Sequence, residues 1–123
     1  MKILFAEDCP MLQEAIGYTL TSHGHTVITV ENGKALLERV ATGEYFDLLI
    51  TDNHMPFLNG IDAIKQIRAN PIFNALPIIL HSAMDPYAMH AIEEQLHRLG
   101  NAWVISKTGM DDLLDTIAKI TLT

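Results

Sequence analysis

The chain has 123 residues, the size of one domain, and 49% of them are hydrophobic, which is enough for a folded core. Its 15 acidic and 8 basic residues give a formal net charge of −7 with no run of Lys or Arg, which disfavours direct contact with nucleic acid. The apolar runs are too short to cross a membrane. Glu7-Asp8 interrupts the first of them, which argues against a signal peptide, and a single cysteine excludes an internal disulfide. We therefore expect one cytoplasmic domain over residues 1–123 without membrane contact.

Short apolar runs alternate along the chain with longer segments of helical periodicity. Each run is bounded by polar or turn residues, as expected for strands of a parallel sheet whose two faces are both covered. The predicted strands are residues 3–6, 27–30, 48–51, 78–81 and 103–105.

Between these strands, apolar residues recur at three- and four-residue spacing, which predicts amphipathic helices. The apolar stripes are Met11, Leu12, Ala15, Ile16 and Leu20; Leu36, Leu37 and Val40; Ile61, Ile64 and Ile67; Ala88, Ala91, Ile92 and Leu96; and Leu113, Leu114 and Ile117. Gly24, Gly43 and Gly100 stand where helices should stop, because glycine adopts the left-handed cap conformation without strain. Asn70-Pro71 ends the third helix.

This order of elements is that of five successive βα units. Because crossovers between parallel strands are right-handed, such a chain forms an α/β fold, a doubly wound five-stranded parallel sheet with helices on both faces. The fold by itself indicates no activity.

Chemically reactive side chains follow four of the predicted strands. Glu7 and Asp8 follow the first and Asp52 follows the third. Ser82 follows the fourth and Lys107 the fifth. Ligands of open α/β sheets bind beyond the carboxyl ends of the strands, so we expect these side chains to converge there.

Each of these residues also has an ordinary structural explanation. Asp8 and Ser82 could cap the first and fourth helices, Asp52 could be a turn residue, and Lys107 a solvated lysine. Their shared position at strand ends favours a functional site instead. Clustered carboxylates repel each other, and Mg²⁺, which prefers a few oxygen ligands and keeps several waters, removes that conflict. The lysine would bind phosphoryl oxygens and one carboxylate would act as nucleophile.

At these residues the chain resembles the receiver domain of bacterial response regulators. The most specific part is Leu49-Ile50-Thr51-Asp52-Asn53-His54-Met55-Pro56 with Asn59-Gly60-Ile61, which looks like the phosphoacceptor strand, its Met-Pro loop and the glycine that opens the third helix. The resemblance covers residues 1–123 as a single receiver domain. It implies the flavodoxin-like (βα)5 fold typified by CheY, with strand order 2-1-3-4-5.

The resemblance also implies roles for the matching positions. Asp52 would be the phosphorylated aspartate, and Mg²⁺ would be bound by Asp8 directly, by Glu7 through water, by Asp52 and by the backbone carbonyl of His54. Lys107 would contact the phosphoryl group.

Ser82 would move toward that group after transfer, and His54 and Met84 occupy positions that tune dephosphorylation in the family. The His54 side chain would hydrogen-bond the phosphoryl group or orient attacking water; the simpler interpretation is a solvated loop histidine. The remaining histidines show no convincing metal spacing.

Three positions depart from the family pattern. Thr108 replaces the usual proline after Lys107, which leaves open whether that bond is cis or trans. Val104 replaces the usual aromatic switch residue, and Trp103, one place away, should point to the opposite face of the sheet. Ser82 replaces the commoner threonine.

The function expected from this resemblance is signalling rather than turnover of an outside substrate. A sensor histidine kinase or histidine phosphotransfer protein would phosphorylate Asp52, and a downstream protein or output domain would read the face formed by the fourth and fifth helical units. Three alternatives stay open: a flavodoxin-like cofactor binder, a metal-dependent phosphatase, and a degenerate receiver that serves only as an interaction module.

Overall fold

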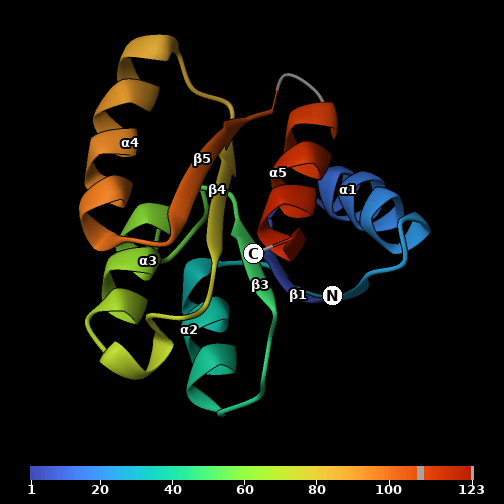
Figure 1. The fold of residues 1–123 in the computed structure, drawn as a ribbon, viewed down its shortest axis with the longest axis horizontal. Helices are drawn as coiled ribbons and strands as arrows, with labels where there is room; N and C mark the ends of the chain where they lie inside the picture. Colours follow the sequence, from blue (N-terminus) through green and yellow to red (C-terminus); the bar gives the residue numbers. More distant parts are fainter. Residues whose placement is uncertain (108–109, 123) are drawn as a thin grey trace.

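The chain alternates strands and helices in the computed structural model, which describes residues 1–107 and 110–122 (Figure 1). The strands are β1 (Lys2–Ala6), β2 (Thr26–Val30), β3 (Leu48–Thr51), β4 (Ile78–Ser82) and β5 (Ala102–Ser106). The helices are α1 (Pro10–Ser22), α2 (Gly33–Ala41), α3 (Gly60–Arg68), the short 3₁₀ helix η1 (Pro71–Phe73), α4 (Pro86–Leu99) and α5 (Met110–Leu122). No helix in the described part of the chain has both the length and the apolar character needed to cross a bilayer.

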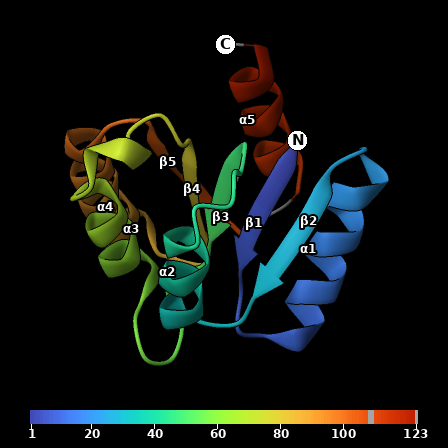
Figure 2. The same ribbon diagram turned by 90° about the horizontal axis from the view of Figure 1, so that it is seen from below.

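All five strands are parallel and lie in the order β2-β1-β3-β4-β5, which confirms the predicted fold class and strand order (Figure 2). Ile3 of β1 is in register with Val27 on one side and with Leu48 on the other. The chain therefore changes direction across the sheet between β1 and β3. In open α/β sheets a ligand site lies at the carboxyl end of such a switch point.

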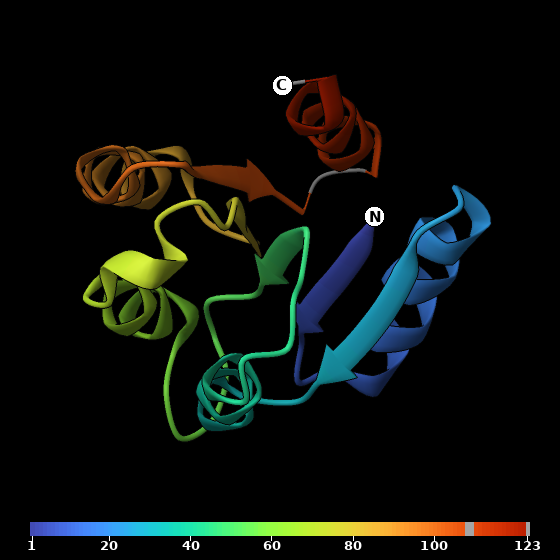
Figure 3. The same cartoon turned by 60° about the horizontal axis from the view of Figure 1, so that its bottom comes forward.

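Helices cover both faces of this sheet (Figure 3). A separate hydrophobic core lies on each face. On β1, Leu4 and Ala6 face the core shared with α2, α3 and α4, whereas Ile3 and Phe5 face the core shared with α1 and α5. This alternation follows from the two-residue period of a strand, and it explains why continuous apolar runs marked the strands.

The apolar stripes are confirmed for α2, α3 and α5, whose predicted residues are buried or half-buried against the two cores, but they are too wide for α1 and α4. The prediction is wrong for Met11 and Ala15 of α1 and for Ala91 of α4, which are exposed. Both helices cover only a narrow strip of the sheet, so α1 buries Ile16 and Leu20, and α4 buries Leu96 alone. Sequence periodicity shows which face is apolar, but not how much of it the partner covers.

A buried arginine ties together the amino edge of the sheet, where the parallel strands begin. Arg68, 9% exposed, donates from Nε to the carbonyl of Gly100 at 3.1 Å and from Nη1 to that of Phe73 at 2.6 Å. Its Nη2 donates to the carbonyls of Leu76 at 2.6 Å and Asn101 at 2.9 Å. One guanidinium thereby joins α3 to η1 and to the turns that precede β4 and β5.

Glycines stand at two close contacts between backbone segments. A Cβ atom on Gly60 would overlap the carbonyl of Asp52, and one on Gly33 would overlap the carbonyl of Leu58. The first turns of α3 and α2 therefore press on the two ends of the loop between β3 and α3. The predicted helix stops are also confirmed, because Gly24, Gly43 and Gly100 all have positive φ.

Candidate functional site

The predicted site residues converge at the carboxyl edge of the sheet. One carboxylate oxygen each from Glu7, Asp8 and Asp52 can be chosen so that all lie within 4.8 Å of one another. In the described part of the chain this is the only group of three or more His, Cys, Asp or Glu side chains that meets this criterion. The switch point between β1 and β3 therefore places the acids together, as the sequence predicted.

Lys107 joins this cluster rather than pointing to solvent. Its Nζ lies 2.6 Å from Glu7 Oε1 and 3.4 Å from Asp52 Oδ1, and its side chain is 15% exposed. Its backbone N–H donates to the carbonyl of Ser82 at 3.3 Å, which continues the β4–β5 ladder and fixes where the side chain starts. The interpretation of Lys107 as a solvated surface lysine is therefore wrong.

Glu7 is the most deeply buried of the acids, with 1% of its surface exposed. Burial raises the pKa of Glu7, the Asp52 charge raises it further, and the hydrogen bond from Lys107 opposes the shift. Its Oε2 accepts from the N–H of Cys9 at 3.3 Å, and its carbonyl accepts from the side chain of Gln13 at 2.5 Å. The cluster sets one ammonium against three carboxylates, and a divalent cation would offset the repulsion among them.

Asp52 is 7% exposed and has one oxygen engaged. Oδ1 accepts from the N–H of Asn53 at 2.8 Å and faces Lys107. No residue within 1–107 or 110–122 donates a hydrogen bond to Oδ2. The backbone N–H of Asp52 donates to the carbonyl of Ala6 at 2.9 Å, so β1 holds the residue from behind. Asp52 is thus fixed by its backbone and one oxygen, while the second oxygen has no donor in the described part of the chain.

Asn53 is a site residue to which the sequence gave no role of its own. It is 8% exposed, its Oδ1 accepts from the N–H of Ile61 at 3.0 Å, and its carbonyl accepts from the N–H of Gly60 at 2.9 Å. These bonds hold the residue after Asp52 against the start of α3. Nothing in an isolated Asn identifies such a bridge, because its partners lie seven and eight residues further along the chain.

The structure also decides whether Asp8 and Ser82 are helix caps. The N-cap of α1 is Cys9, without a side-chain hydrogen bond, and the N-cap of α4 is Asp85, whose side chain accepts from the N–H of Ala88 at 2.8 Å. Neither predicted residue is therefore a cap. Ser82 is fully buried, and its Oγ has no hydrogen-bond partner in the described part of the chain. This hydroxyl at the carboxyl edge can still donate a hydrogen bond.

His81, next to Ser82, was not predicted to matter. It is 2% exposed, and neither of its ring nitrogens has a hydrogen-bond partner among residues 1–107 and 110–122. Burial, with a smaller effect of the Lys107 charge, lowers the pKa of His81 to about 4. Strand alternation would have indicated its burial toward α1 and α5, but not the lack of partners.

The remaining predicted positions differ in outcome. Val104 packs against the core of α2, α3 and α4, whereas Trp103 lies on the opposite side of β5, as predicted from its one-residue offset. Met84 is half-buried against the same core as Val104, and the His54 side chain is exposed. The roles of the His54 carbonyl and of both modulators stay predictions. The bond to Thr108 lies outside the described residues.

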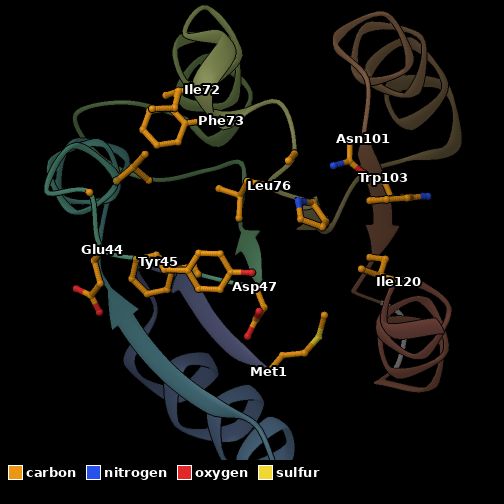
Figure 4. A pocket seen from close by; sticks show the side chains of 15 residues that line it. Met1, Glu44, Tyr45, Asp47, Ile72, Phe73, Leu76, Asn101, Trp103 and Ile120 are labelled. Carbon is orange, nitrogen blue, oxygen red and sulfur yellow. The ribbon is translucent and has the colours of Figure 1, made fainter. Parts of the chain in front are cut away.

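A large cavity lies at the opposite edge of the sheet from the acids. It has a volume of about 870 Å³ and lies at the amino edge, where Tyr45, Phe73 and Trp103 are among the residues that line it (Figure 4). None of Glu7, Asp8, Asp52, Ser82 or Lys107 borders it. Cavity size therefore does not locate the candidate site, whereas the convergence of charges does.

The donor set at the carboxyl edge fits a hard divalent cation. Glu7, Asp8 and Asp52 supply carboxylate oxygens, which Mg²⁺ prefers, and they come from two neighbouring strand ends. Asp8 is exposed, so the site opens to solvent and leaves room for the waters that Mg²⁺ retains.

Comparison with known proteins identifies the family. The response regulator receiver domain matches residues 3–118. A chemotaxis protein CheY homolog from Campylobacter jejuni is 35% identical over 81 residues, which cover 65% of this chain and 62% of that protein. The sensory/regulatory protein RpfC from Xanthomonas campestris is 30% identical over 123 residues, 98% of this chain and 16% of RpfC. The chain thus spans less than two thirds of either relative.

Solved structures agree. The receiver domain of response regulator 1452 from Francisella has a TM-score of 0.84 at 24% identity, with 97% of this chain and 94% of that one covered, which shows the shared fold. TrrA from Thermotoga maritima, solved in complex with Mg²⁺ and BeF, has a TM-score of 0.79 at 26% identity and 97% coverage of both chains. The receiver domain of sensor histidine kinase PA1611 from Pseudomonas aeruginosa, solved with a magnesium ion in its active site cleft, has a TM-score of 0.77 at 29% identity, covering 96% and 93%. The chain belongs to the response regulator receiver domains of two-component signalling.

Proposed function

We propose that Asp52 accepts a phosphoryl group from a phosphohistidine, with Mg²⁺ held at the carboxyl edge of the sheet by Glu7, Asp8, Asp52 and the backbone carbonyl of His54. The observation that carries this proposal is the convergence of three carboxylates with the Lys107 ammonium around one open oxygen of Asp52. Mg²⁺, when bound, supplies neutralising charge for the carboxylates and for the transferring phosphoryl group.

The transfer itself needs little more than alignment. Asp52 Oδ2 forms a bond to phosphorus as the bond from phosphorus to the donor imidazole nitrogen breaks, and that nitrogen leaves with the bonding electron pair. Oδ1 stays held by the N–H of Asn53, which orients the carboxylate during attack. Phosphoryl transfer depends mainly on positioning and charge stabilisation, so this short set of groups suffices.

The product changes the balance of contacts around Lys107. A phosphoryl group on Asp52 brings about two negative charges and new acceptor oxygens. These compete with Glu7 for the Lys107 ammonium, which lies between the two acids. The buried Ser82 hydroxyl, which has no partner in the described part of the chain, would turn toward the same oxygens. Both movements pull on the ends of β4 and β5, next to α4 and α5.

The partners follow from this switch. A sensor histidine kinase or histidine phosphotransfer protein supplies the phosphoryl group, and a downstream protein or output domain reads the face formed by α4, β5 and α5. The matches to the regulatory protein RpfC and to the receiver domain of a sensor histidine kinase support a kinase partner. The chain would promote only its own phosphorylation and dephosphorylation, in the cytoplasm, and would not turn over an outside substrate.

The alternative of a degenerate receiver is not favoured. A module that served only for protein contacts would not need three carboxylates, a lysine and an unpaired hydroxyl at one edge. A flavodoxin-like cofactor is disfavoured because Glu7 and Asp8 would repel its phosphate where the first loop should bind it.

Intact mass after incubation with acetyl phosphate and Mg²⁺ tests the proposal. We expect the unmodified chain to gain one phosphoryl group and Asp52→Asn to gain none. Asp115→Asn, an exposed acid on α5, is the matched control and should be phosphorylated normally. No gain by the unmodified chain, or an equal gain by Asp52→Asn, contradicts the assignment.

A further inference from the structure

The amino-edge cavity is the space of about 870 Å³ drawn in Figure 4. Its volume lies within the range of roughly 300–1,000 Å³ that is usual for cavities holding small molecules. Aromatic side chains from three separate segments line it, namely Tyr45 before β3, Phe73 of η1 and Trp103 of β5. The clustered carboxylates of the proposed phosphorylation site do not border it, so the two sites are separate.

Asp47 gives the amino-edge cavity a fixed negative charge. The residue lines the cavity and is half-buried. Its Oδ2 accepts from the backbone N–H of Lys2 at 2.7 Å, and its own N–H donates to the Lys2 carbonyl at 2.8 Å, so β1 holds the carboxylate in place. The Tyr45 hydroxyl lies beside the same carboxylate, and its hydrogen bond to Asp47 raises the pKa of Tyr45 (Figure 4). Both donors are neutral, so they orient the charge of Asp47 without cancelling it.

No cation in the described part of the chain forms an ion pair with Asp47, and this includes the amino group of Met1. The ion pairs near the cavity join Lys2 and Arg39 to Glu44, the other acid that lines it, so the charge of Glu44 is already balanced. No Lys, Arg or His side chain among the described residues lines the cavity. A carboxylate that is partly withdrawn from water and lacks a counter-charge favours a cationic ligand and repels an anionic one.

The walls of the cavity favour an organic cation over a metal ion. Mg²⁺ and Ca²⁺ need several oxygen ligands, and Asp47 is the only carboxylate among the described lining residues that lacks a cation partner. An organic ammonium needs only one carboxylate, and the rings of Phe73 and Trp103 offer apolar surface and negative π faces to the rest of the molecule. We propose that the amino-edge cavity binds a small aromatic amine in its protonated form, with the ammonium at Asp47 and the ring against the aromatic walls. This site does not depend on the proposed phosphorylation, because Asp52 takes no part in it.

The fluorescence of Trp103 tests this site, because Trp103 is the only tryptophan of the chain and lines the cavity. The probes are three compounds with the same phenyl ring: phenethylamine, which is cationic at neutral pH, phenethyl alcohol, which is neutral, and hydrocinnamate, which is anionic. We expect phenethylamine to change the emission saturably and to bind roughly three- to tenfold more tightly than the alcohol, which is the effect of one partly solvated ion pair. Hydrocinnamate should bind more weakly than either. The absence of a saturable change with phenethylamine, or equal affinities for the amine and the alcohol, would overturn the proposal.

Two pairs of variants separate the charge from the aromatic walls. Asp47→Asn keeps an acceptor for the N–H of Lys2 but loses the charge, so it should bind phenethylamine only as tightly as the alcohol. Its matched control is Asp62→Asn, at an exposed acid of α3 outside the cavity, which should keep the preference for the amine. Phe73→Leu removes one ring and should weaken binding of the amine and the alcohol by the same factor, roughly two- to tenfold. Phe57→Leu, at an exposed phenylalanine outside the cavity, should weaken neither.

A preference for the amine that survives Asp47→Asn would contradict the proposal, and so would unchanged affinities in Phe73→Leu. Hydrocinnamate that binds as tightly as phenethylamine would rule out selection by charge. If Asp47→Asn does not fold, the comparison of the three probes on the unmodified chain decides alone.

Discussion

Two buried cations at opposite edges of the sheet differ in the nature of their partners. At the amino edge, Arg68 donates to four neutral backbone carbonyls. At the carboxyl edge, Lys107 lies against the carboxylates of Glu7 and Asp52. The carbonyls of Phe73 and Asn101 also accept from backbone N–H groups, so they are held by the main chain as well, whereas carboxylates can exchange a cation for a metal ion. Both cations are shielded from solvent, but only the partners of Lys107 could exchange it for another cation.

Arg68→Met should have the largest effect on stability, because it removes four hydrogen bonds to backbone carbonyls at once. We expect a loss of about 3–5 kcal/mol in the free energy of unfolding, measured by urea denaturation. Arg98→Met, on the exposed surface of α4, is the matched control and should change little. A loss for Arg68→Met no greater than for this control would mean that the amino edge does not rely on the guanidinium.

His81 extends the comparison to a buried base with no partner at all. Its pKa falls from 6.5 to about 4 on folding, so below pH 6.5 the unfolded chain binds a proton that the folded chain does not. The free energy of unfolding therefore carries the full contribution of uncharged His81 above pH 6.5. It falls by up to about 3 kcal/mol as the pH is lowered to about 4. In His81→Leu the urea midpoint should depend less on pH between these values. His97→Leu, at an exposed position, should keep the pH dependence of the unmodified chain. Parallel pH profiles for His81→Leu and the unmodified chain would contradict this.

Lys107→Met tests whether Lys107 and Mg²⁺ compete for the same carboxylates. Without the ammonium, the carboxylates no longer share their charge with a competing cation, so Mg²⁺ should bind on the order of tenfold more tightly, about 1.4 kcal/mol. The rise in Tm on adding Mg²⁺ reports this affinity and should be larger for Lys107→Met than for the unmodified chain. In Arg68→Met and in the exposed-lysine control Lys65→Met the rise should be unchanged. An equal rise in all four proteins would show that the lysine and the metal do not compete.

Glu44 should show the smallest effect. It pairs with Lys2 at 2.7 Å and Arg39 at 2.8 Å near the amino edge, and the hydrogen bond from Arg39 lowers the pKa of Glu44 more than any other contact. All three side chains are partly solvated, and such pairs contribute little. Glu44→Gln should leave the urea midpoint within experimental error at low and at high salt. A clear, salt-dependent loss of stability would mean that these two ion pairs contribute more than ordinary surface contacts do.

Most of the fold and the charged part of the site could be predicted from the sequence, because both depend on local order. Apolar runs marked the strands, and residues directly after Ala6 and Thr51 had to meet once β1 and β3 were neighbours. Arg68 could not be predicted, since its partners lie up to 33 residues away and its position in a helix resembles that of a solvated arginine. The same limit applies to His81, whose lack of partners depends on how α1 and α5 pack over β4.

The close approach of Gly33 to the carbonyl of Leu58 has a mechanical consequence. Because no side chain separates the two backbones, the loop that carries Asp52 toward α3 cannot shift outward without displacing the first turn of α2. A rearrangement that starts at Asp52 would reach the first turn of α2 through main-chain contact. A single methyl group at position 33 would overlap the Leu58 carbonyl and force the two backbones apart.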